Sequence, residues 1–374
     1  MTRVLAGVTV DDTRSWGPPE LPYTDGVERS FPGESAYYLS VDRNNKSLGL
    51  SFNNPNGISI IHGLVQKCDV LVENYLPGSL AKYQLDYATI SKLNPSLVYA
   101  SVTGYGQAGP YSDRAGYDVI VEMGLIHITG ERDRPPVKVG VAITDISTGM
   151  YTAIGVLAAL YSRKETGLGQ WIDASLSDCQ VAGLANIASS CLLTGNKDSG
   201  RWGTAHAAVV PYRAYKTKDT NIAVGGCNDK LYGILSNKLG ESEWRTDPRL
   251  VTNALRVKHR EILDAMVEAE LQLRTTQEWL QIFEGSGMPY AAVNDIQGTI
   301  NHEHVLARGM IEEVDHPACG KVKLVNHPVK YSHIEPKIRS APPLLGEHTS
   351  EVLQQLLGYD EVKTNSLKND QTVA

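Results

Sequence analysis

Strand-like and helix-like segments alternate along the chain from residue 47 onward, and this alternation restricts the possible folds more than any other feature. An apolar strand pattern at 47–52 is followed by a helix pattern that begins at Pro55, a residue suited to the first turn of a helix. Further strand patterns at 70–72 and 97–102 flank a second helical stretch. This spacing predicts an α/β fold whose large, Rossmann-like domain is built on a parallel sheet.

In a parallel sheet, ligands bind beyond the carboxyl ends of the strands. Asn74 and Tyr75 directly follow the second predicted strand, and Gly104 and Tyr105 directly follow the third. We therefore expect these four residues at one ligand-binding edge. Tyr105 stands between two glycines, which let a backbone approach a flat ligand closely.

Four cations lie near this predicted edge: Arg43, Lys46, Lys82 and Arg114. The chain of 374 residues has a net charge of −7, so a polyphosphate ligand would need locally placed cations. Each cation alone is typical of a solvated surface, but together they suit a phosphorylated cofactor. No run of five Lys or Arg occurs, so the charge pattern predicts neither a nucleic-acid partner nor a membrane partner.

Asp145 stands between an apolar segment and the strongest helix pattern of the chain, at 149–163, which we expect to be buried. An aspartate before a helix usually caps it by accepting hydrogen bonds from backbone N–H groups. The same position would also orient an ionised carboxylate for nucleophilic attack. Position alone does not separate the two interpretations.

The composition becomes polar and rich in glycine at 195–203, which predicts a domain boundary. Short strand patterns and amphipathic helix patterns follow, so we expect a smaller, separate α/β domain. The predicted order is a large domain at 1–190, a linker at 191–204, the small domain at 205–315, a return linker at 316–340, a C-terminal helical segment that rejoins the large domain at 341–362, and a disordered polar tail at 363–374.

The boundary and the small domain contain further candidate residues. Arg201 and His206 suit a clamp for a carboxylate, or equally a structural hinge. Gly225 and Gly226 suit a mobile flap over an active site, or a plain turn in which Asn228 caps the next helix.

Other chemistries find little support in the sequence. The glycines at 104, 106 and 109 match a dinucleotide-binding pattern, but Pro110 follows at once and no helix opens there. The five cysteines never occur as CxxC, and no metal-ligand spacing is present, so we expect no metal. The N-terminal residues show no signal or organelle-targeting pattern.

Several stretches together resemble the family III CoA-transferases of the CaiB/BaiF type. The matching stretches are 11–14, 16–19, 36–47, 73–78, 103–111, 114–118, 140–149, 226–229 and 342–349. They follow the family order over nearly the whole chain, and 201–206 and 283–290 are most similar to members that act on dicarboxylic acids.

The resemblance implies an enzyme that moves CoA from succinyl-CoA or a similar donor to an acid such as glutarate or hydroxymethylglutarate. It implies that Asp145 forms an anhydride and then an aspartyl-CoA thioester. Acyl-CoA is then a substrate, and no permanently bound cofactor is expected. The resemblance places Tyr117 among the residues around CoA, and it implies an interlocked homodimer in the mitochondrion.

Two alternatives remain. Racemases of 2-methylacyl-CoA share this fold but carry a histidine where this chain has Tyr117, whose phenol is a poor base at neutral pH. The chain also departs from the family near its start, where 2–7 runs almost directly into Asp11 and strands expected at the centre of the sheet are absent. An inactive relative is the alternative of a different class.

Overall fold

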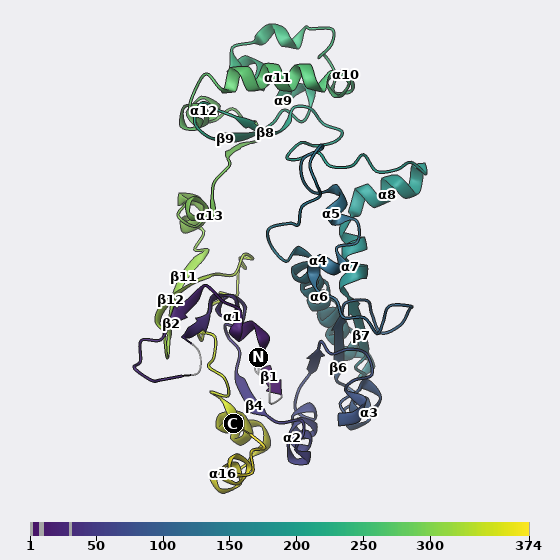
Figure 1. Ribbon diagram of the computed structural model, residues 1–374, viewed down its shortest axis with the longest axis vertical. Helices are drawn as coiled ribbons and strands as arrows, with labels where there is room; N and C mark the ends of the chain where they lie inside the picture. Colours follow the sequence, from purple (N-terminus) through teal and green to yellow (C-terminus); the bar gives the residue numbers. More distant parts are fainter. Residues whose placement is uncertain (1–2, 7–10, 30–31, 374) are drawn as a thin grey trace. The chain divides into compact units, whose positions relative to one another are not determined.

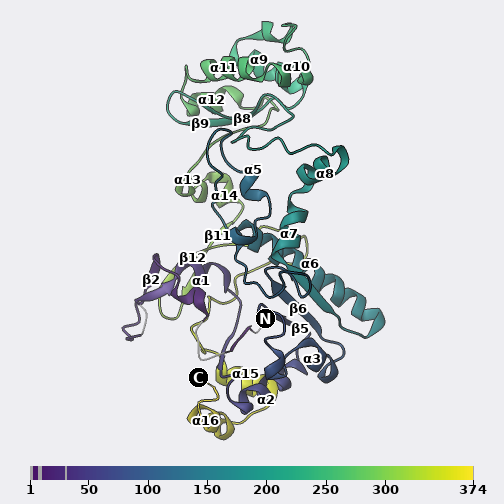
Figure 2. The same cartoon turned by 45° about the vertical axis from the view of Figure 1, so that its right-hand side comes forward.

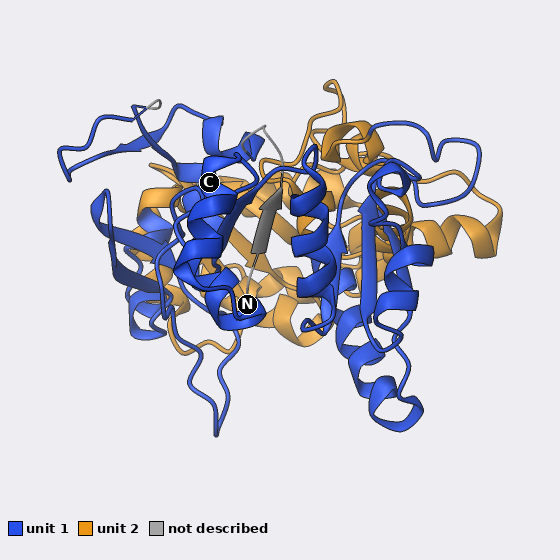
Figure 3. Ribbon diagram, turned by 90° about the horizontal axis from the view of Figure 1, so that it is seen from below, with its two compact units in different colours: residues 1–115, 148–175, 298–374 blue, residues 116–147, 176–297 orange. Residues whose placement is uncertain are grey.

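The computed structural model describes residues 3–6, 11–29 and 32–373, and the chain divides into two compact units (Figure 3). Unit 1 comprises residues 1–115, 148–175 and 298–374, and unit 2 comprises 116–147 and 176–297. Segments 116–147 and 176–190, which we expected in the large domain, therefore group with 191–297. The predicted boundaries, which follow the order of the chain, stay a prediction.

Unit 1 contains the parallel sheet that the sequence predicts. Its strands are β5 (Val70–Glu73), β6 (Val98–Thr103) and β7 (Trp171–Ser175), with β6 in the middle. Both pairs are parallel, so the three carboxyl ends lie at the same edge. Most side chains of β6 are buried, as expected for a central strand that is covered on both faces.

Strand β4 (Ser47–Leu50) pairs with β1 (Arg3–Ala6) in parallel, rather than with β5. Among the described residues, no strand joins the β1–β4 pair to β5, β6 and β7. The sheet of unit 1 is thus present as two pieces. Residues 3–6, which the sequence pattern matched to a loop of the family, form a strand.

Helices α2 (Pro55–Val65), α15 (Thr349–Leu357) and α16 (Glu361–Asn369) pack with β4 around one core (Figures 1 and 2). The predicted disorder at 363–374 is wrong. Leu367 is only 7% exposed, Val373 forms an antiparallel bridge with Leu50, and the N–H of Ser51 donates to the carbonyl of Thr372 at 2.9 Å. These few apolar side chains hold an otherwise polar segment on the core.

Another part of unit 1 surrounds a second, smaller core to which Tyr38, Leu39, Val322 and Leu324 contribute. Its elements include two antiparallel pairs, β2 with β3 and β11 with β12. The remaining elements of unit 1 are η1 (Asp12–Ser15), β2 (Glu20–Pro22), β3 (Gly33–Ser35), α1 (Ala36–Val41), η2 (Ala81–Tyr83), α3 (Tyr87–Leu93), α14 (Glu303–Ala307), β11 (Ile311–His316) and β12 (Gly320–Val325).

Unit 2 contains an antiparallel sheet in which β9 (Asn221–Gly225) lies between β8 (Tyr212–Lys216) and β10 (Tyr290–Ala292). Its helices bury Leu235, Leu263 and Phe283 in a core of their own. The helical bounds are α4 (Asp118–Val121), α5 (Leu125–Ile128), α7 (Leu176–Gly183), α8 (Ala185–Thr194), α9 (Asp229–Leu239), η3 (Ser242–Arg245), α10 (Asn253–Lys258), α11 (Arg260–Leu271), α12 (Thr276–Phe283) and, at the unit boundary, α13 (Ile296–Ile300).

Helix α6 (Ile143–Thr166) has 24 residues and runs beside β7 in both views of the cartoon (Figures 1 and 2). The expectation that it is buried is wrong, since Ile154 is 63% exposed and Leu157 is 67% exposed. Small residues face the sheet instead, with Gly155 directly against Ile172. The helix is long and apolar enough to cross a bilayer, a test that the core helix of a soluble protein also passes.

Candidate active site

Asp145 is the third residue of α6, because the helix begins at Ile143. We had expected the aspartate before the helix, as a cap. Its neighbour Thr144 is buried and donates a hydrogen bond from its hydroxyl to Oε1 of Gln180 at 2.7 Å, which fixes the start of α6 to α7. Residue Asp145 itself is exposed in the single chain, so a substrate can reach it.

Three ionisable side chains of unit 2, those of Asp118, Glu122 and Lys138, lie near Asp145. Lys138 Nζ forms an ion pair with Asp118 Oδ2 at 2.8 Å, and Glu122 lies near both. Desolvation by the surrounding atoms raises the pKa of Asp145, repulsion from Asp118 adds to this, and attraction to Lys138 opposes it. The pKa of Asp145 is therefore raised overall. A helix N-terminus by itself favours the ionised carboxylate, so the expected effect of the helix is outweighed here.

Asp118, Glu122 and Lys138 were missed as candidate site residues. Asp118 occurs in the family-like stretch 114–118, which was a usable signal. Glu122 follows the last residue of the short helix α4, and Lys138 lies in an irregular segment. Neither has a local sequence pattern that points to Asp145, because their proximity arises from the folding of unit 2.

At the edge of the parallel sheet in unit 1, Asn74 and Tyr75 follow β5, and Gly104 and Tyr105 follow β6, as predicted. The glycine loop is held at two points. The N–H of Gly106 donates to Thr103 Oγ1 at 2.9 Å, and the N–H of Gln107 donates to Asp173 Oδ2 at 2.9 Å. Gly106 has a φ of +87°, which favours glycine.

A pocket of about 380 Å³ lies in unit 1 beside the amino end of α2. Lys82 contributes to its wall, and its ammonium group lies 4.7 Å from the ring centre of Tyr83. Phe52 contacts both Tyr83 and Tyr75. The pocket is lined by Phe52, Asn53, Pro55, Ile58, Ser59, His62, Lys82, Tyr83 and Gln84. A cation beside aromatic rings suits a nucleotide with a phosphate group.

The other three predicted cations have partners within unit 1. Arg43 donates to the carbonyl of Ser40 at 2.9 Å, and Lys46 forms an ion pair with Glu351. The guanidinium of Arg114 lies 3.7 Å from the ring centre of Tyr111, which also contacts Tyr105. Arg114 is thus the second predicted cation, besides Lys82, that lies against an aromatic side chain.

Arg201 and His206 lie in unit 2. The guanidinium of Arg201 donates to two backbone carbonyls, those of Glu131 at 3.2 Å and His127 at 3.1 Å. The ring of His206 is exposed, stacks on Tyr212, and accepts the N–H of Ala208 at Nδ1. A carboxylate clamp at Arg201 therefore has to compete with these carbonyl contacts.

Gly225 and Gly226 are buried at the end of β9, where their N–H groups donate to the carbonyls of Pro289 and Pro211. An opening flap would have to break both hydrogen bonds. Asn228 caps α9 by accepting the N–H of Leu231 at 2.9 Å, as its position before the helix predicts. Tyr117 directly precedes α4 and is exposed.

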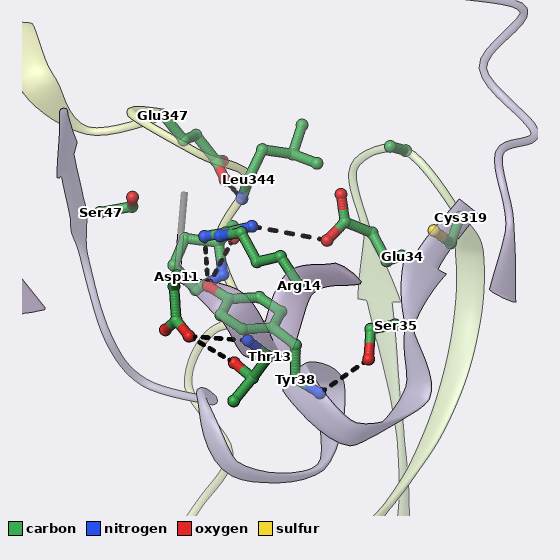
Figure 4. A network of polar contacts seen from close by, with 12 residues as sticks. Asp11, Thr13, Arg14, Glu34, Ser35, Tyr38, Ser47, Cys319, Leu344 and Glu347 are labelled. Carbon is green, nitrogen blue, oxygen red and sulfur yellow. Dashed lines mark hydrogen bonds and ion pairs between the residues drawn. The ribbon is translucent and has the colours of Figure 1, made fainter. Parts of the chain in front are cut away.

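The family-like stretch 11–14 has a structural role in unit 1, shown in Figure 4. Arg14 is buried, lies over the ring of Tyr38 at 3.8 Å, and donates to the carbonyl of Pro343 at 3.0 Å. It also forms an ion pair with Glu34 at 3.5 Å. One arginine thus connects segments that lie more than 300 residues apart in the sequence.

Residues 4–349 match the family described as CoA-transferase family III. The chain belongs to this family. It is a CoA-transferase with the α/β fold of the family, and the fold and family that the sequence predicts are confirmed.

Related proteins support the same conclusion. Succinyl-CoA:glutarate CoA-transferase of Mus musculus is 42% identical over 353 residues, which are 94% of this chain and 78% of that protein. Succinate–glutarate CoA-transferase of Agrobacterium fabrum is 36% identical over 356 residues, covering 95% and 88%. The crystal structure of a CAIB/BAIF family protein from Brucella suis matches with a TM-score of 0.82 at 35% identity, covering 95% of this chain and 91% of that one.

Proposed function

We propose that this CoA-transferase transfers CoA from succinyl-CoA to glutarate or to a similar dicarboxylic acid such as hydroxymethylglutarate. The names of the mouse, human and Agrobacterium relatives support this choice of substrates. The observation that carries the proposal within this chain is the accessible carboxylate of Asp145 at the start of α6. A mitochondrial location, implied by the resemblance alone, is part of the same proposal.

The proposed reaction begins with the attack of Asp145 on the succinyl-CoA thioester. An Oδ atom of Asp145 forms a bond to the acyl carbon, the carbon–sulfur bond breaks, and its electron pair leaves with sulfur as CoA thiolate. The thiolate then attacks the aspartyl carbon of this anhydride. Succinate leaves, and an aspartyl-CoA thioester remains.

The second half of the proposed reaction repeats these steps in the opposite direction. The carboxylate of the acceptor acid attacks the aspartyl thioester and releases the thiolate again. The thiolate attacks the acyl carbon of the acceptor, which gives the new acyl-CoA and frees the carboxylate of Asp145. No proton is gained or lost, so the site needs a nucleophilic carboxylate and protection from water.

We place the nucleotide end of CoA in the pocket of unit 1. Lys82 offers a cation for a phosphate group, and the rings of Tyr83 and Phe52 offer a surface for the adenine. Asn74, Tyr75, Gly104 and Tyr105 would contact the rest of CoA along the sheet edge. Arg43, Lys46, Arg114 and Tyr117 remain further contacts in this proposal.

We also propose that the protein works as a homodimer. The exposed apolar residues of α6 and α8 include Met150, Ile154, Leu157, Leu192 and Leu193. Large apolar side chains that gather exposed on one helix mark interaction sites. A second copy of the chain, as the family resemblance implies, would cover them.

A trapping experiment tests the covalent role of Asp145. The protein is mixed with succinyl-CoA, treated with hydroxylamine and digested, and the peptides are measured by mass spectrometry. We expect a hydroxamate on Asp145 only when acyl-CoA is present, and a loss of transfer of roughly a thousandfold or more in Asp145→Asn. Asp133→Asn, at an exposed aspartate of the neighbouring loop, is the matched control. Full activity of Asp145→Asn would refute the proposal.

A further inference from the structure

Glu122 is more deeply buried than the carboxyl groups that surround it. Glu122 directly follows the last residue of α4 and is only 4% exposed. Among the described residues, neither of its carboxyl oxygens has a hydrogen-bond partner. An ionised carboxylate in such a place is strongly disfavoured, because it loses its water without gaining donors.

The charged groups near Glu122 do not compensate for its burial. Asp118 and Asp145 are acidic, and the nearby cation Lys138 already pairs with Asp118 at 2.8 Å. Helix α7, which packs against α4, contributes Asp178 and Cys179. Asp178 is exposed and accepts a hydrogen bond from Ser177, so this helix supplies no cation.

We propose that Glu122 is a positioning residue that stays uncharged beside Asp145 and thereby sets the upper limit of the pH range in which acyl transfer works. This inference rests on the proposed role of Asp145. Burial first, and then repulsion from Asp118, raise the pKa of Glu122 above its ordinary value of 4.5, and Lys138 only partly opposes them.

The order of ionisation belongs to the proposal and rests on the surroundings of the two groups. Asp145 is exposed, whereas Glu122 is buried with neither oxygen hydrogen-bonded, so we expect Asp145 to lose its proton first as the pH rises. The site then holds an ionised nucleophile beside a neutral acid. When Glu122 ionises at higher pH, a further negative charge repels the acceptor carboxylate and the CoA thiolate, both of which are anions.

The test compares the pH dependence of kcat/KM for the acceptor acid in the wild type and in Glu122→Gln. We expect the wild type to rise and then fall by up to tenfold per pH unit, well below the pKa of lysine at about 10.4. The decrease of kcat/KM at high pH should be absent in Glu122→Gln. It should be kept in the control Glu165→Gln, which changes an exposed residue of α6. A falling part that is the same in Glu122→Gln and the wild type would overturn the inference.

A second measurement does not depend on activity. Difference infrared spectra of wild type minus Glu122→Gln at neutral pH should show the carbonyl stretch of a protonated carboxylic acid. An ionised signal would overturn the inference even if Asp145 is trapped as expected. An active Asp145→Asn would overturn the proposed function instead, so the two failures are distinguishable. If circular dichroism shows that Glu122→Gln does not fold, Glu122→Met provides a neutral, apolar substitute.

Discussion

At the scale of single residues, the surroundings of Asp145 determine when it can act as a nucleophile. Its pKa is raised by desolvation and by Asp118, while Lys138 acts in the opposite direction. The ion pair between Asp118 and Lys138 therefore has a mixed effect on Asp145. Changing either partner shifts this balance in a direction that can be stated beforehand.

The first prediction concerns the acidic side of the pH profile. Activity requires an ionised Asp145, so it falls as the pH drops through the raised pKa, which lies above the ordinary 3.8. Lys138→Met removes the attraction and should move this part of the profile to higher pH. Asp118→Asn removes the repulsion and should move it to lower pH. Initial rates of acyl exchange across a pH series measure both shifts, and shifts in the same direction would contradict this account.

The second prediction concerns the choice of acceptor acid. If Arg201 holds the distal carboxylate, Arg201→Ala should raise KM for glutarate by about tenfold or more and leave KM for a monocarboxylate nearly unchanged. If Arg201 serves only to hold the carbonyls of His127 and Glu131, both KM values should change by the same factor. Steady-state kinetics with the two acids distinguish these outcomes.

At the scale of elements, α16 shows how a polar segment can belong to a core. Its residues are mostly polar, but Leu367 contacts the core formed by α2, α15 and β4. Thr372 and Val373 then extend along β4 through backbone hydrogen bonds. The segment thus covers an edge of β4 that would otherwise present unpaired backbone groups.

The third prediction follows from this contact. Leu367→Ala should lower the free energy of unfolding by about 2–4 kcal/mol, because it removes buried methyl groups and leaves a cavity. Val362→Ala, on the same helix at 79% exposure, should change it by less than about 0.5 kcal/mol. Urea denaturation followed by circular dichroism measures both values. Equal effects of the two variants would show that α16 does not pack as described.

At the scale of the whole molecule, the exposed apolar residues of α6 and those of α8 are features that a single chain leaves unexplained. Leu192 and Leu193 are among the most exposed large apolar residues of the described chain. Burying such side chains contributes about 1.5–3 kcal/mol each. A homodimer would therefore gain considerable stability from this surface.

The fourth prediction tests that assembly. Light scattering of the wild type should give twice the mass of the chain, and a variant with Ile154→Lys and Leu157→Lys should give the mass of one chain. The charged side chains would have to lose water at an apolar contact, which is strongly unfavourable. Val362→Lys, at an exposed residue outside this surface, is the control and should stay dimeric. A monomeric wild type would contradict the proposal.

The sequence by itself determined the local and periodic features of this protein. The strands at 70–73 and 98–103 follow from their apolar patterns, and the edge formed by Asn74, Tyr75, Gly104 and Tyr105 follows from the geometry of parallel strands. The family followed from motifs in order along nearly the whole chain. These inferences depend on neighbours in sequence, and so they could be drawn before the fold was known.

Only the tertiary structure decided which distant residues meet. The proximity of Glu122 and Lys138 to Asp145, the packing of α16 on β4, and the exposure of α6 had no local signal in the sequence. Burial and charge depend on atoms brought together from far along the chain. The apolar pattern of α6 shows that this helix has apolar side chains that favour burial. Only the tertiary structure shows which of these side chains the chain itself buries and which remain exposed.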